Sequence, residues 1–97
     1  FRERVASFDP VTGRMLAAFR DDGPLDPVSA HVAAGGDGDR PSAYARLRRL
    51  RRAGFVEHDG GGRYAYALPA LLRDRYADRL SAAELRAAVS SVEDALP

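Results

Sequence analysis

The stretch that decides the fold is residues 40–63, which read RPSAYARLRRLRRAGFVEHDGGGR. Leu47 and Leu50 recur in it at helical spacing and predict an α-helix over about residues 41–53. Gly54 follows, at the position where a glycine commonly ends a helix in a left-handed conformation. Six arginines and no acidic residue lie between positions 40 and 52. The predicted helix is therefore densely positive, and its function depends on where these arginines point.

The residues after this helix predict a β-hairpin. Phe55–His58 has the composition of a strand, residues 59–62 (Asp-Gly-Gly-Gly) predict a turn, and Arg63–Leu68 predicts the returning strand. Tyr64 and Tyr66 alternate with small or charged residues in the second strand. They should therefore lie on one side of the hairpin.

Two further helices are expected before residue 40. The pairs Asp9-Pro10 and Asp26-Pro27 each combine a capping residue with a proline suited to the first helical turn. The first pair opens a predicted helix over Pro10–Arg20, and the second opens one of about two turns. A glycine-rich loop, Gly35–Asp39, separates this second helix from the basic one. No strand precedes the loop and no Gly-Lys-Ser/Thr follows it, which argues against a phosphate-binding loop.

After the hairpin, Pro69 breaks the strand and can begin a fourth helix. Residues 81–84 (Ser-Ala-Ala-Glu) form a capping box, which predicts a final helix over Ala82–Leu96. This helix carries an apolar stripe made of Leu85, Val89, Val92 and Leu96. The expected fold class is thus mainly α with a small β-hairpin (α+β), extended by a C-terminal amphipathic helix.

Charge is unevenly distributed along the 97 residues. The 15 basic residues, all arginine, nearly balance 14 acids, for a net charge of +1. Residues 40–63, however, hold seven arginines and two acids, whereas residues 1–39 hold four arginines and seven acids. On a helical wheel, Ala43, Leu47 and Leu50 form a narrow apolar side of the basic helix, and most of its arginines fall elsewhere. Arginines without acidic neighbours repel each other, which favours an anionic partner.

Three helices, the third of them basic, followed by a hairpin is the order of a winged helix-turn-helix. Residues 41–56, PSAYARLRRLRRAGFV, resemble the recognition helix and first wing strand of ArsR- and MarR-like prokaryotic transcriptional regulators. In that pattern a leucine stands four residues before a glycine, which a large apolar residue and a valine follow. Residues 57–68 are similar to the wing, and the resemblance covers about residues 9–68. The glycine-rich connection before the basic helix is longer than the tight turn usual in this superfamily.

The resemblance implies sequence-specific binding of double-stranded DNA, with the basic helix in the major groove. Mapped onto this chain, it places Ser42, Ala45, Arg46 and Arg49 toward the base edges. Arg48 and Arg52 would meet phosphates, as would Arg40 at the helix start, and Arg63 would follow the wing turn to the backbone or minor groove. The expected role is a transcriptional regulator or a DNA-contacting module. The alternative is a winged-helix domain that binds another protein within a larger assembly.

The chain is expected to divide into a winged-helix domain, residues 1–68 with the wing at about 55–68, and a C-terminal helical extension, residues 69–97. In ArsR-like regulators a terminal helix of this kind commonly makes a homodimer, which implies dimer contacts by Leu85, Val89, Val92 and Leu96. The alternative is that this helix folds back onto the domain's own core beside Phe1, Val5 and Phe8.

Other chemistry is not expected. The chain has no cysteine, which excludes the thiolates of many ArsR-like metal sensors, and its two histidines, His31 and His58, lack enough nearby ligands for a metal site. No serine has an evident His/Asp pair and Gly-x-Ser-x-Gly does not occur, so an enzyme is not expected. No cofactor is expected either. Apolar runs are far below the roughly 20 residues that cross a bilayer, and a cytoplasmic protein without a membrane partner is predicted.

Overall fold

Three helices begin in the same way, with an aspartate that caps the first turn. The computed structural model describes residues 2–96, and these helices are α2 (Pro10–Asp22), α3 (Pro27–Ala33) and α4 (Arg40–Ala53). Their caps are Asp9, Asp26 and Asp39, and each carboxylate accepts a hydrogen bond from the backbone N–H three residues on. This bond satisfies an amide that has no partner within its helix. The helix starts predicted at the two Asp-Pro pairs are confirmed.

The end of α4 leads directly into the hairpin. Gly54 adopts the left-handed conformation with φ 82°, and its backbone N–H bonds the last turn of the helix. The strands are β1 (Val56–Gly60) and β2 (Arg63–Tyr66), paired antiparallel. The first strand thus extends two residues beyond the predicted His58, and the register shifts between His58 and Gly60. Gly61 and Gly62 form the turn, both with positive φ, as a tight hairpin turn requires.

The connection between α2 and α3 lies beside the hairpin. Leu25 exchanges two backbone hydrogen bonds with Tyr64, Leu25 N–H to the Tyr64 carbonyl at 3.1 Å and Tyr64 N–H to the Leu25 carbonyl at 2.8 Å. This short bridge adds a third extended segment to the edge of β2. It fixes the hairpin against the helices, so the hairpin is not an isolated two-stranded ribbon.

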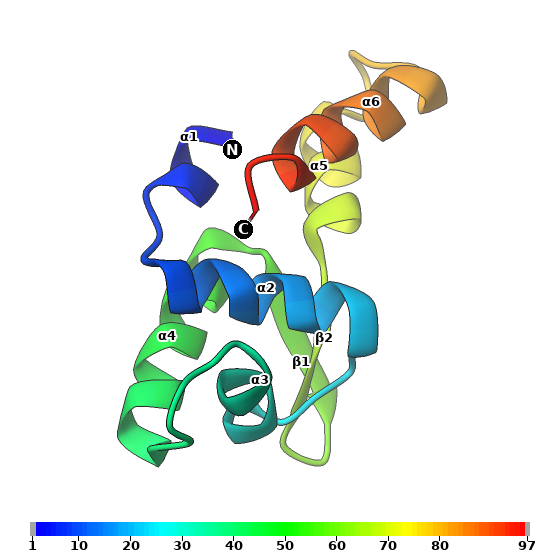
Figure 1. Cartoon of the computed structure of the whole chain (residues 1–97). Helices are drawn as coiled ribbons and strands as arrows, with labels where there is room; N and C mark the ends of the chain where they lie inside the picture. Colours follow the sequence, from blue (N-terminus) through cyan, green and yellow to red (C-terminus); the bar gives the residue numbers. More distant parts are fainter. Residues whose placement is uncertain (1, 97) are drawn as a thin grey trace.

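One hydrophobic core joins the helices to the hairpin. Met15, Leu16 and Phe19 from α2 are buried with Leu47 and Leu50 from α4. The β-hairpin joins the core through the residues that open it, with Phe55 fully buried and Val56 nearly so. In Figure 1 the hairpin tip and the N-terminal end of α4 point toward the same end of the molecule. The α+β architecture predicted from the sequence is confirmed.

The C-terminal helices share this core. They are α5 (Leu68–Tyr76) and α6 (Ala82–Glu93), which pack on each other at the opposite end of the molecule (Figure 1). Leu68 and Leu72 are buried in the same cluster as the α2 and α4 residues. The capping box of Ser81 and Glu84 is confirmed, but α6 ends at Glu93, three residues before the predicted Leu96.

This packing covers one of the predicted dimer contacts, Val92. Val92 is only 5% exposed and belongs to the core that also contains Val5 from α1 (Arg2–Ala6), a helix that packs against α6. Its side chain is therefore packed within the chain, in the way that the fold-back alternative describes. Phe8 packs against the same core, while Phe1 lies outside the described residues. Leu85, Val89 and Leu96 remain half-buried.

Candidate nucleic-acid interface

The outward face of α4 is defined by what its opposite side buries. Ala43, Leu47 and Leu50 are buried, as predicted, and Ala53 joins them at 8% exposure. Because Ala53 is buried too, the centre of the buried side of α4 lies slightly away from the direction that the helical wheel predicts from Ala43, Leu47 and Leu50. The residues opposite the core are therefore Ala45, Arg48 and Arg52, all exposed. Among the described residues, no ion pair or hydrogen bond holds the Arg48 or Arg52 side chain.

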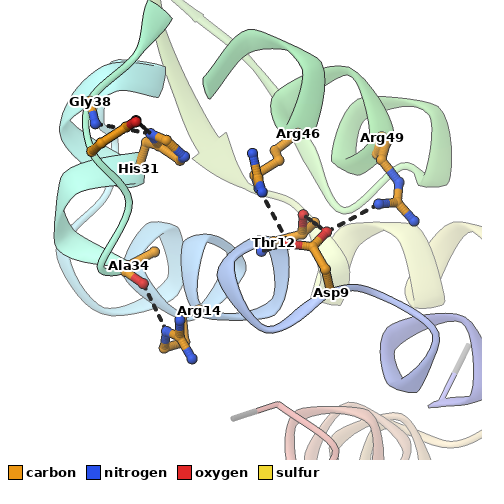
Figure 2. A network of polar contacts seen from close by, with 9 residues as sticks. Asp9, Thr12, Arg14, His31, Ala34, Gly38, Arg46 and Arg49 are labelled. Atoms are coloured by element: carbon orange, nitrogen blue, oxygen red, sulfur yellow. Dashed lines mark hydrogen bonds and ion pairs between the residues drawn. The ribbon is translucent and has the colours of Figure 1, made fainter. Parts of the chain in front are cut away.

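Arg46 and Arg49 point from α4 toward the start of α2, where both meet Asp9 (Figure 2). Arg46 Nε lies 3.2 Å from Asp9 Oδ2, and Arg49 Nη1 lies 3.1 Å from Asp9 Oδ1. Arg49 is half-exposed, whereas Arg46 is 30% exposed. The guanidinium of Arg46, which the resemblance implies is directed toward base edges, lies at the flank of α4, against α2.

Asp9 is held by four donors at once. Thr12 donates its backbone N–H to Oδ2 and its hydroxyl to Oδ1, and the two arginines supply the other two bonds. Burial alone would raise the pKa of Asp9, but the hydrogen bonds from Thr12 and Arg46 outweigh it and the pKa lies below its usual value. Asp9 is therefore a carboxylate anion at neutral pH.

Two further arginines of α4 lie over aromatic rings. The Arg51 guanidinium is 5.3 Å from the ring centre of Tyr64 in β2, and that of Arg40 is 4.8 Å from the ring centre of Tyr44. Both side chains are exposed, so the rings orient the charges without neutralising them. Arg63 begins β2 and is exposed, with no ion pair or hydrogen bond of its side chain among the described residues.

The geometry of α2, α3, α4 and the hairpin agrees with what sequence comparison finds. The whole chain, residues 1–97, matches the family described as the Halobacterial winged helix domain. The chain belongs to this family. Comparison with curated proteins and with solved structures found no significant match.

In this winged helix domain, α3 and α4 are the helix-turn-helix pair and β1–β2 is the wing. Ser42 and Ala45 lie on the N-terminal half of α4, Ser42 half-buried and Ala45 exposed. The six predicted contact arginines divide into three groups. Arg48, Arg52 and Arg63 are exposed and unpaired among the described residues, Arg46 and Arg49 are paired with Asp9, and Arg40 is stacked on Tyr44.

The long glycine-rich connection between α3 and α4, Gly35–Asp39, has a role that the sequence did not predict. It folds over His31, which is only 3% exposed and whose Nδ1 accepts a hydrogen bond from Gly38 N–H at 3.2 Å (Figure 2). A side chain at Gly36 would collide with the His31 ring, since an added Cβ would lie 2.4 Å from it. The loop is therefore packed and positions the start of α4. In the sequence, the one sign of this packing is that His31 stands seven residues before Gly38.

Residues 2–96 contain no cluster of three or more His, Asp or Glu side chains that could hold a metal ion. Within the same residues, no helix is both long and apolar enough to span a bilayer.

The contacts of Asp9 predict a pH-dependent contribution to stability. Asp9→Asn should lower the free energy of unfolding at neutral pH by about 1 kcal/mol, because two partly exposed ion pairs are lost while asparagine keeps the cap. The folded pKa of Asp9 lies below the unfolded value of about 3.9. Its stabilisation is thus complete above that pH and is lost as the pH falls through the folded value.

Urea unfolding of the wild type and Asp9→Asn checks this prediction at neutral pH and at about pH 2.5, well below the unfolded value. The difference between the two proteins should shrink toward zero in acid. An equal difference at both pH values would show that the charge of Asp9 does not stabilise the fold.

Proposed function

We propose that this winged helix domain binds double-stranded DNA through the outward face of α4 and the wing, as a transcriptional regulator or as the DNA-contacting module of a larger protein. The observation that carries the proposal is the set of exposed arginines Arg48, Arg52 and Arg63, none of which has an acidic partner among the described residues. A carboxylate placed within α4 would neutralise them, and the helix contains none.

Electrostatics favours an anionic partner for this face. Arg48 and Arg52 are one helical turn apart on the same side of α4, so their like charges repel in the free protein. A polyanion relieves this repulsion and releases its own counterions when it binds. The small side chain of Ala45, between them and the N-terminal end of α4, allows close approach of the helix backbone to a groove wall.

The arrangement supports a division of roles along the interface. Ser42 and Ala45 lie on the N-terminal half of α4, the half that meets base edges in helix-turn-helix proteins. Arg48 and Arg52 would contact phosphates, with Arg40 at the helix start. Arg63 would contact the backbone or the minor groove from the wing. The resemblance to ArsR- and MarR-like regulators supports regulation of transcription as the role of the contact.

The alternative is that the same face binds another protein. Arginine is also common at protein interfaces, so the two hypotheses are separated by the charge that the partner must carry. Arg48 and Arg52 repel each other without an acidic partner among the described residues, and a DNA duplex supplies a dense array of negative charges. The arginine-rich centre of the α4 face favours DNA.

DNA binding predicts a steep dependence on salt. Titration of a random duplex with the domain at several salt concentrations between about 50 and 200 mM should give a linear fall of log affinity with log salt, with a slope near −0.9 for each phosphate neutralised. Circular dichroism at each salt concentration controls for unfolding. The proposal fails if the folded domain does not bind the duplex at the lowest salt at which it stays folded.

The outward arginines can be tested singly. Arg48→Ala and Arg52→Ala should each weaken duplex binding and reduce the salt slope by about one, whatever the DNA sequence. Arg79→Ala is the matched control, since Arg79 is exposed in the turn between α5 and α6, away from α4. If Arg79→Ala has the same effect as the α4 variants, binding is not localised to α4.

We also propose a homodimer, through a surface smaller than the predicted apolar stripe because Val92 is not part of it. A groove of about 550 Å³ lies between α5 and α6 and is lined by Leu85 and Val89 together with Pro69, Ala82, Arg73, Arg86 and Ser90. We propose that a second copy covers this groove. Val92 takes no part, and removal of α6 would expose the core, so a point substitution is the appropriate test.

Light scattering of the intact chain should give about twice the 10.5 kDa chain mass at high concentration. Val89→Arg should return the chain to the monomer mass, because it places a third positive charge beside Arg73 and Arg86 in the contact. Circular dichroism confirms that this variant is folded. A wild-type chain that stays at the single-chain mass at every concentration would disprove the dimer.

A further inference from the structure

Asp9 differs from the other two helix-capping aspartates. Among the described residues, the carboxylates of Asp26 and Asp39 each bond only the residue three positions on, Ser29 and Ser42 respectively. Asp9 makes the same capping bonds to Thr12 but also pairs with two arginines of α4 that lie 37 and 40 residues away in sequence. The cap does not require these arginines, so the ion pairs are an additional property of Asp9.

The position of Asp9 relative to α4 is fixed by its neighbour. The Phe8 ring packs edge-on against Phe55, with ring centres 5.9 Å apart, and Phe55 directly follows the turn that ends α4. The Arg49 guanidinium lies 5.6 Å from the ring centre of Phe8. Asp9 is therefore an anion held at a constant place beside the recognition helix, and it cannot swing away without loss of core packing and of the α2 cap.

The two ion pairs are accessible to a competing anion. Asp9 is 35% exposed and Arg49 is 51% exposed, so solvent reaches the pair. Each guanidinium uses a single nitrogen on Asp9, Nε of Arg46 and Nη1 of Arg49. A phosphate offers arginine the same kind of charged, two-oxygen acceptor that a carboxylate does. A duplex phosphate that reaches this flank of α4 must share these two arginines with Asp9 or displace it.

We propose that Asp9 competes with DNA phosphates for Arg46 and Arg49 and so restrains the affinity of α4 for DNA. This inference rests on the proposed function. In the free protein the Asp9 carboxylate pairs with both arginines and offsets one of their two positive charges. The arginines at the centre of the outward face, Arg48 and Arg52, are not restrained in this way. The flank of α4 thus contributes to binding only when a phosphate is placed well enough to replace Asp9.

Asp9→Asn tests the proposal, because asparagine keeps the cap and removes the charge. The variant should bind a random duplex more tightly than the wild type at about 50 mM salt. Each arginine freed for a phosphate should steepen the salt slope by about 0.9, which corresponds to a further three- to fourfold loss of affinity between about 50 and 200 mM salt. Fluorescence anisotropy with a labelled duplex measures both quantities.

Two matched variants separate the restraint from simpler effects. Asp26→Asn repeats the same change at a cap with the same Asp-Pro sequence and no arginine partner. Asp78→Asn repeats the charge change at an exposed position in the turn between α5 and α6. Both should leave the salt slope at the wild-type value.

The outcomes are distinct. A wild type and variants that all fail to bind the duplex overturn the proposed function and this inference with it. Wild-type binding with an unchanged slope in Asp9→Asn overturns the restraint alone. Weaker binding by Asp9→Asn shows that Asp9 positions the arginines for DNA and also overturns the restraint. An equal gain in all three variants assigns the effect to net charge and overturns it as well.

Discussion

The narrow apolar side of α4 is the constraint on which the rest of the structure depends. A helix with six arginines buries only Ala43, Leu47, Leu50 and Ala53, and the core can accept it in one rotation only. Any other rotation would place a guanidinium in the core without a partner, which costs far more than the packing gains. This single choice of rotation decides which arginines face outward, which reach α2 and which lie over the wing.

The rotation of α4 does not by itself decide the environment of each arginine, because the elements around α4 supply partners to some of them. The start of α2 supplies Asp9 on one flank, and β2 supplies the Tyr64 ring on the other, over which Arg51 lies. The outward strip between the flanks receives no partner from the described residues. The near-neutral net charge of the chain therefore conceals a division between arginines that have intramolecular partners and arginines that have none.

Local features of the fold could be predicted from the sequence because neighbouring residues determine them. The Asp-Pro caps, the left-handed Gly54 and the Ser81–Glu84 box each depend on a few consecutive residues, and each is confirmed. The environments of Arg46 and Val92 could not be predicted, because they depend on residues far away in the chain. A helical wheel shows that Arg46 is not in the core, but it does not contain Asp9, 37 residues earlier. Similarly, the apolar stripe on α6 indicates that Val92 packs against another apolar surface. It does not indicate whether that surface belongs to the same chain or to a second copy.

The same non-local contacts connect the C-terminal helices to the wing. The Tyr66 hydroxyl on β2 donates a hydrogen bond to Glu93 on α6 at 2.7 Å, and burial together with this carboxylate raises the pKa of Tyr66 well above its usual range. Tyr66 is therefore a neutral hydrogen-bond donor at neutral pH. Val92, the residue before Glu93, is buried in the core with Val5. Leu68 and Leu72 of α5 are buried in the same core. A contact made by α6 is consequently in direct physical connection with the strand that carries Arg63, whereas a detached C-terminal extension would have no such connection.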